Sequence, residues 1–185
     1  MIRIAKIEKN KLSKRTLDRM YSILIDAYAR TETDVWGENY IRISKEEFTK
    51  LVIRGEVFGA FKNNLILGSV HLFKKTENTF CFGLLSVDFK TTKIGVGGKL
   101  IKHIENVAIK KGGRIMELEI LRPKKLETPF KKVLRIWYSK LGYVHFGSGT
   151  FEEIKPEKKE KAKKLVQPCI FDCYQKIISK SKDNT

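Results

Sequence analysis

Apolar residues near the N-terminus alternate with polar ones, and the spacing then changes to every third or fourth position. This pattern predicts a strand over residues 2–7 and an amphipathic helix over residues 12–29, with Ser13 or Thr16 as its cap. Ser44 is followed three residues later by Glu47, the spacing of a capping box. A second, short helix is therefore expected to begin there and to end near Ile53.

The middle of the chain reads as strands, and the last half alternates helices with strands. Lys62-Asn63-Asn64 separates two apolar runs, and asparagine tolerates the positive φ of a tight hairpin. Gly112-Gly113 is expected to stop a long helix. The expected strands are 56–61, 65–73, 79–87, 114–121, 143–147 and 170–177, and the expected helices are 95–111 and 130–141. This order is typical of an α/β fold.

The turn between the strand over 79–87 and the next helix contains three closely spaced glycines, Gly95, Gly97 and Gly98. Glycine lets a ligand approach the backbone closely, and the first turn of a helix presents unpaired N–H groups and a positive dipole end. Together they form an anion site. Neither a Walker loop nor a dinucleotide fingerprint fits, because position 93 is not glycine and position 100 is Leu.

The glycine turn resembles the acetyl-coenzyme A motif of the GNAT superfamily of N-acetyltransferases, which reads Arg/Gln-x-x-Gly-x-Gly/Ala. Gly95 and Gly97 match it, whereas Thr92 stands at the Arg/Gln position. A later family motif, Tyr-x-x-x-Gly-Phe/Tyr on a helix, is similar to Tyr138, Gly142 and Tyr143. The family often has Asn seven residues before this tyrosine, where this chain has Lys131.

The resemblance implies a GNAT-like mixed α/β fold, with a central, mostly antiparallel sheet flanked by helices. Together with the chain length, it predicts one domain over residues 1–178, and the terminal residues 179–185 are expected to fray. It further implies direct transfer of an acetyl group from acetyl-CoA to a primary amine in a ternary complex, with no metal. The acceptor would be a small molecule or a peptide.

The family's functional positions map onto this sequence residue by residue. The N–H of Val87 would stabilise the thioester oxygen, and Tyr138 would protonate the departing thiolate. The residues expected to contact the coenzyme lie at the strand end, in the glycine turn and on the later helix: Leu85, Ser86, Val87, Lys93, Ile94, Gly95, Val96, Gly97, Gly98, Lys99 and Tyr138.

The general base is less determined. Glu117 and Glu119 alternate on one face of a strand, and Glu119 is the candidate base, although both also suit a solvated strand end. His71 and His145 are alternatives that fit structural roles better. The polar and aromatic connection containing Glu32, Asp34, Trp36 and Tyr40 suits either an acceptor wall or a plain surface loop.

Composition agrees with one globular domain: the chain has 185 residues, of which 42% are hydrophobic. No run of 18 apolar residues and no signal-peptide core is present, so a cytoplasmic protein without a membrane segment is expected, as a monomer or homodimer. The cysteines Cys81, Cys169 and Cys173 are expected as reduced thiols in strands or core rather than as metal ligands, because no His lies near them.

The net charge of +17 is the feature that the enzyme hypothesis does not explain. It predicts attraction to polyanions, with non-specific nucleic-acid binding at most, because no base-reading motif accompanies the lysines. Two alternatives to an enzyme therefore stay open. One is a basic nucleic-acid-binding protein on the same fold, and the other is an acyl-CoA-binding regulator without turnover.

Overall fold

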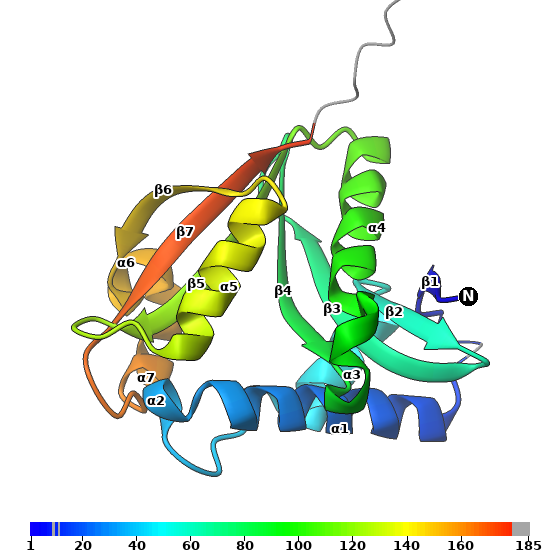
Figure 1. Ribbon diagram of the computed structural model, residues 1–185, viewed down its shortest axis with the longest axis horizontal. Helices are drawn as coiled ribbons and strands as arrows, with labels where there is room; N and C mark the ends of the chain where they lie inside the picture. The colour runs from blue at the N-terminus through cyan, green and yellow to red at the C-terminus, as the bar shows by residue number, and fades with distance from the viewer. Residues whose placement is uncertain (9, 11, 179–185) are drawn as a thin grey trace, which may run out of the picture. The chain divides into compact units, whose positions relative to one another are not determined.

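The computed structural model describes residues 1–178 except 9 and 11, and for Thr92 and Lys93 it describes the backbone only. The chain forms two compact units (Figure 1). The first contains residues 1–27 and 42–116 and the chain from 177, and the second contains residues 28–41 and 117–176. The single domain over 1–178 stays a prediction, and the predicted frayed tail lies outside the described residues.

The strands of the first unit are antiparallel neighbours in the order β1-β2-β3-β4. The hairpin between β2 and β3 turns through Asn63 and Asn64, whose φ angles are 50° and 62°. The tight hairpin with positive φ at asparagine, which the sequence predicted, is therefore present. The strands are β1 (Arg3–Lys6), β2 (Val57–Lys62), β3 (Leu65–Lys74) and β4 (Thr79–Val87).

Helical elements of the described residues accompany these strands: α1 (Lys14–Thr31), α3 (Lys45–Ile53), the 3₁₀ helix η2 (Phe89–Ile94) and α4 (Val96–Lys110). The last residues of α1, from Tyr28 on, belong to the second unit. The capping box of Ser44 and Glu47 starts α3 as predicted. In α4 the apolar face is buried and packs on β2, β3 and β4 (Figure 1).

The second unit contains most of the alternating part of the chain. Its strands are β5 (Ile115–Pro123), β6 (Val144–Gly149) and β7 (Cys169–Ile177), except that the first two residues of β5 and the last of β7 belong to the first unit. In the sheet, β7 lies between the other two and is antiparallel to β6. Its helices are α2 (Thr33–Trp36), α5 (Pro129–Lys140), α6 (Phe151–Ile154), the 3₁₀ helix η3 (Pro156–Lys158) and α7 (Lys159–Ala162).

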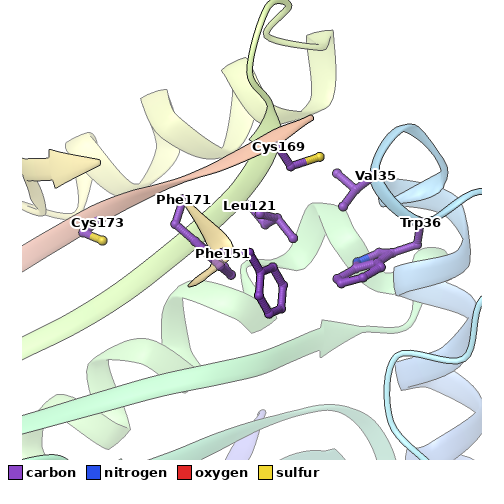
Figure 2. Packing of buried hydrophobic residues seen from close by; sticks show 7 residues of the cluster. All are labelled: Val35, Trp36, Leu121, Phe151, Cys169, Phe171 and Cys173. Carbon is purple, nitrogen blue, oxygen red and sulfur yellow. The ribbon is translucent and has the colours of Figure 1, made fainter. Parts of the chain in front are cut away.

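A compact apolar cluster organises this second unit. Figure 2 shows the rings of Trp36 and Phe151 next to each other, among side chains from α2, β5 and β7. The two rings meet edge to face, with centroids 6.0 Å apart, and Phe151 also packs on Phe171. Edge-to-face contacts suit the ring quadrupoles. The one-turn helices α2 and α6 are therefore fixed by tertiary packing.

The mixed α/β class and the mostly antiparallel pairing were predicted correctly. The differences concern short elements. The connection around residues 33–36 contains the helix α2, and the charged run 155–164 contains η3 and α7. One helical turn is too short to show a periodicity, so neither was foreseeable from spacing.

Candidate functional site

The glycine turn has the geometry of an anion cradle. Gly95 is the N-cap of α4 and adopts the left-handed conformation, with φ 74°, which favours glycine. Its carbonyl accepts the first bond of the helix, from the N–H of Lys99 at 3.2 Å. A Cβ at Gly98 would meet no atom within 4 Å, so the space beside the first turn is open. The N–H groups of this turn point along the axis, out of the helix start.

An ion pair that the sequence did not predict fixes the start of η2, the segment that leads into this turn. Arg19 on α1 donates from Nη2 to Asp88 Oδ2 at 2.7 Å and from Nε to the carbonyl of Ile66 at 3.0 Å. Asp88 caps η2, since its Oδ1 accepts the N–H of Lys90. Arg19 therefore connects α1, β3 and the segment that leads into the cradle. Its partner lies 69 residues away, which explains why spacing along the chain gave no hint of it.

The C-terminal end of β4 presents the backbone group that was proposed to stabilise the thioester oxygen. Asp88 donates its N–H to the carbonyl of Leu67 on the β3 side, at 2.8 Å. Neighbouring residues of an antiparallel strand point their N–H groups to opposite sides. The N–H of Val87 therefore points away from β3, as the proposed role requires.

A bulge lies just before this strand end. The β3–β4 register shifts between Ser69 and His71, and Leu84 has a φ of +49° within the strand. A bulge adds an unpaired residue and bends its strand. It lies directly before Leu85 and Ser86, two of the predicted coenzyme contacts. The sequence carries no hint of it, because leucine is not a residue expected at positive φ.

Tyr138 is buried on α5 of the second unit, at 7% exposure. Its ring lies against Trp137 and Tyr143, with centroids 4.9 and 5.9 Å away. The helix ends as predicted: Gly142 has a φ of 90°, and the N–H of Tyr143 donates to the Tyr138 carbonyl at 3.0 Å. Burial raises the pKa of Tyr138 far above its usual range, so the hydroxyl holds its proton more tightly than an exposed tyrosine does.

Glu119 on β5 forms an ion pair. Its two carboxylate oxygens lie 2.6 and 2.9 Å from the Nζ of Lys155, which follows α6. Both side chains are about one quarter exposed, at 24% and 22%. Glu119 is thus already engaged by an ammonium group of the chain itself. Its role as base stays a prediction.

Lys131, where the family often has Asn, lies in the interior. Its side chain is 3% exposed, and its Nζ is 3.7 Å from Glu32 Oε1. The other oxygen of Glu32 accepts the indole N–H of Trp36 at 3.0 Å. Lys131 therefore connects α5 to the segment that carries α2. This observation assigns it a structural role that sequence spacing did not suggest.

The surroundings of this ion pair are acidic. Both carboxylate oxygens of Asp34 are buried and have no hydrogen-bond partner among the described residues. Burial, together with Asp34, raises the pKa of the Cys169 thiol to about 11. The thiol donates to the carbonyl of Gln167. Cys169 is thus a neutral, buried side chain, and Cys81 and Cys173 are also buried and form no disulfide.

The two histidines considered as bases have local partners. His71 lies 3.1 Å from Glu56 and stacks on Phe73. His145 lies 3.0 Å from the hydroxyl of Ser148, which donates to Asp172 at 2.7 Å. These contacts agree with the structural roles favoured above.

A hollow of about 740 Å³ opens between α5, β6 and β7. Asp172 lies in its wall and accepts two hydrogen bonds from Arg122, at 2.6 and 3.2 Å. Arg135 and Glu127 form a second bidentate pair there. His145, one of the alternative bases, lines this hollow, whereas Val87, Glu119, Tyr138 and the described coenzyme contacts do not.

The predicted residues therefore form two groups. Val87 and the glycine turn belong to the first unit, whereas Glu119 and Tyr138 belong to the second. Within the described residues, no group of three or more His, Cys, Asp or Glu side chains is arranged to hold a metal. In the same part of the chain, no helix has the length and apolar character needed to cross a membrane.

Comparison with known proteins gives matches in structure and none in sequence. No protein-family model matches the chain, and no curated protein matches it. Among solved structures, an aminoglycoside 6′-N-acetyltransferase complexed with coenzyme A superimposes with a TM-score of 0.72 at 15% identity, over 98% of this chain and 99% of that one. The chain has the fold of the GNAT N-acetyltransferases.

Two further structures agree with this assignment. The PaiA N-acetyltransferase from Thermoplasma acidophilum, in complex with coenzyme A, gives a TM-score of 0.68 at 18% identity, over 96% of this chain and 99% of that one. The ribosomal-protein-S18-alanine N-acetyltransferase from Escherichia coli gives 0.63 at 16% identity, over 100% and 99%. Two of these three enzymes are named for their acceptors, an aminoglycoside and the alanine of a ribosomal protein, and these differ, so the shared fold leaves the acceptor of this chain open.

Proposed function

We propose that the protein is an acetyl-CoA-dependent N-acetyltransferase that acts on a primary amine. The observation that carries the proposal is the turn at Gly95, which leads β4 through η2 into the open N-terminus of α4. That arrangement suits a pyrophosphate, since backbone N–H groups and the helix dipole favour an anion there. Proteins with this fold include enzymes solved with coenzyme A bound.

The residues present fit the coenzyme. The first turn of α4, from Val96 to Lys99, would hold the pyrophosphate, and its one charged side chain is the exposed Lys99. Bound acetyl-CoA would supply an acetyl group activated as a thioester.

The proposal gives this chain's own groups three tasks. The N–H of Val87 would donate a hydrogen bond to an oxygen on which negative charge develops. Glu119 would take a proton from the acceptor ammonium, because only the neutral amine is nucleophilic. Tyr138 would hold a proton at its hydroxyl for the leaving sulfur.

Coenzyme binding is the direct test, and Gly98 offers a matched pair of variants. Gly98→Ala adds one methyl group in the open space that the proposal gives to the coenzyme, so it should weaken binding only slightly, while helix propensity favours Ala by about 1 kcal/mol. Gly98→Glu adds bulk and negative charge at the same position and should raise the coenzyme A dissociation constant at least tenfold.

Titration calorimetry of the wild type and both variants measures the effect, and circular dichroism checks folding. A wild type that binds no coenzyme A at millimolar concentration contradicts the proposal. A screen of alkylamines, aminoglycosides and peptide N-termini with acetyl-CoA then identifies the acceptor by release of free thiol.

A further inference from the structure

The hollow between α5, β6 and β7 lies within the second unit, and its volume of about 740 Å³ suits a small organic ligand. Aromatic and apolar side chains form part of its wall: Tyr143, Val144, His145 and Tyr174. The charged wall residues are two arginines and two carboxylates, which form two pairs. Ligand sites commonly combine an apolar wall with a few polar groups that orient the ligand. The polar groups that the protein itself leaves unpaired therefore decide which ligand fits.

The first pair is satisfied within the protein. Asp172 accepts hydrogen bonds from Arg122 at 2.6 and 3.2 Å, and a third from the hydroxyl of Ser148 at 2.7 Å. The Nη1 of Arg122 donates to the carbonyl of Pro123 at 3.1 Å. Because the hydroxyl hydrogen of Ser148 goes to Asp172, the Nε2 of His145 is the donor to the Ser148 oxygen, 3.0 Å away. Asp172 thus has little capacity left to accept a hydrogen bond from a ligand.

The second pair leaves donors available. Arg135 on α5 donates from Nε and Nη2 to the two carboxylate oxygens of Glu127, at 2.8 and 3.1 Å. Its Nη1 forms no hydrogen bond with any described residue, and the side chain is 43% exposed. A guanidinium has N–H donors on all three of its nitrogens. The two on Nη1 of Arg135 can therefore donate to a ligand.

Tyr174 supplies a buried polar group without a partner. The residue is 2% exposed and lines the hollow, and its ring meets that of His145 edge to face, with centroids 5.4 Å apart. Its hydroxyl forms no hydrogen bond with any described residue. Burial raises the pKa of Tyr174 and Asp172 adds to this, whereas Arg135 opposes it, so Arg135 lies within electrostatic range of the hydroxyl. A buried hydroxyl that lacks a partner costs free energy, which a ligand in the hollow would recover.

We propose that this hollow binds a small organic carboxylate with an apolar body, at a site separate from the proposed coenzyme site. The carboxylate would accept hydrogen bonds from the Nη1 of Arg135 and the hydroxyl of Tyr174, and the apolar body would lie against Val144. The two arginines and two carboxylates of the wall cancel in formal charge. One negative charge on the ligand is therefore easier to accommodate than the two of a phosphate dianion. The inference does not rest on the proposed N-acetyltransferase function.

Benzoate is the probe, and benzamide, which has nearly the same shape and no charge, is its control. Calorimetry at constant pH and ionic strength measures both dissociation constants. Benzoate should bind saturably and at least about tenfold more tightly than benzamide, because hydrogen bonds to an ionised acceptor are the stronger ones. Inorganic phosphate should not displace benzoate. Equal binding of benzamide, or displacement by phosphate, would show that the assigned ligand class is wrong.

Three variants locate the site. Tyr174→Phe removes only the hydroxyl and should weaken benzoate binding by about tenfold. Glu127→Gln removes the negative charge beside Arg135 and should strengthen it by about three- to thirtyfold. Glu160→Gln is the matched control, since it removes a solvent-exposed carboxylate that pairs with Lys163, and it should have no effect. A gain in Glu160→Gln equal to that in Glu127→Gln would reduce the effect to net charge and contradict the inference. Circular dichroism checks folding, and Glu127→Gln keeps the test decisive if Tyr174→Phe is unstable.

The glycine turn is itself suited to anions, so the two sites have to be distinguished. Saturating coenzyme A should leave the benzoate dissociation constant unchanged, and so should Gly98→Glu, which places negative charge in the turn. If coenzyme A displaces benzoate, or if the wild type binds no benzoate at tens of millimolar, the inference is wrong, and the N-acetyltransferase proposal is unaffected. If benzoate binds as expected but coenzyme A does not bind, the hollow stands as a carboxylate site and the enzyme proposal falls.

Discussion

Lys131 occupies a position on α5 where an ammonium group is buried, with its partner Glu32 supplied by the segment ahead of α2. Removing a charge from water is costly, and the cost is offset only when the partner remains in place. Glu32 also holds the indole of Trp36, so this carboxylate serves two groups. The ion pair therefore fixes the orientation of the Trp36 ring. The Nζ of Lys161 lies over this ring, 5.8 Å from its centroid.

Glu32→Gln tests this arrangement, because it keeps the size of the side chain but leaves Lys131 buried without its countercharge. We expect a loss of about 3–5 kcal/mol in the free energy of unfolding. Lys131→Met in the same protein should recover much of that loss, since it removes the stranded charge and keeps an apolar stem. Urea unfolding of both single variants and the double variant measures the coupling. If the losses of the two single variants simply add in the double variant, Glu32 and Lys131 do not interact.

Tyr138 has a hydroxyl that could donate a proton and a ring that belongs to the core. The ring is buried and packs against Trp137 and Tyr143. A structural role depends on the ring, whereas the proposed catalytic role depends on the hydroxyl. The two roles are therefore separable by removing one oxygen atom.

Tyr138→Phe should lower kcat by about ten- to a thousandfold, the range that bounds the loss of a general acid. The coenzyme dissociation constant should change little, since ring and packing remain. Steady-state kinetics with the acceptor from the screen, together with calorimetry, separates the two quantities. Full turnover in the variant would remove Tyr138 from the catalytic residues and leave it as part of the core.

At the scale of elements, the close approach of β3 and β4 positions the end of β4. A Cβ at Gly68 would lie 2.5 Å from the carbonyl oxygen of Ser86 and 3.1 Å from the Cα of Val87. Both are backbone atoms, so the strand itself would have to move. Gly83, on the same strand pair, would meet no atom within 4 Å. A methyl group at Gly68 would therefore displace the backbone next to the proposed oxyanion donor, whereas one at Gly83 would not.

Gly68→Ala should therefore reduce kcat by about ten- to a hundredfold, because small displacements of a catalytic group are costly. Overpacking should also lower the stability by about 1–3 kcal/mol. Gly83→Ala should leave kcat within about twofold of the wild type. Kinetics and thermal unfolding of both variants provide the comparison. A normal kcat in a folded Gly68→Ala protein would argue against a role for the Val87 N–H.

Across the whole molecule, the sequence predicted what local chemistry determines. Three predicted features depend on residues a few positions apart, and the structure contains each of them. They are the capping box at Ser44, the asparagine hairpin and the end of α5 at Gly142. The Arg19–Asp88 and Lys131–Glu32 pairs depend on partners far along the chain, and the positive φ of Leu84 arises within a paired strand. No spacing rule encodes such features. The roles of Val87, Glu119 and Tyr138 stay predictions.

The charge is also a property of the whole chain, and it bears on the alternative of a nucleic-acid-binding protein. A net charge of +17 attracts any polyanion, and the release of condensed counterions drives such binding. Coenzyme binding at a backbone cradle depends far less on bulk charge. Salt therefore separates a specific ligand of the fold from partners that the lysines attract.

We predict that RNA and DNA bind without sequence preference, and that their affinity falls by several orders of magnitude between about 50 and 200 mM salt. Fluorescence anisotropy with two single strands of unrelated sequence and one duplex measures this dependence. Coenzyme A, titrated in parallel by calorimetry, is the control, and its dissociation constant should change by less than about tenfold. A single strand that is preferred over the other and stays bound at the higher salt would favour the nucleic-acid-binding protein. The same result together with coenzyme-dependent acetyl transfer would indicate that one chain performs both functions, because the backbone cradle and the dispersed lysines are independent features of it.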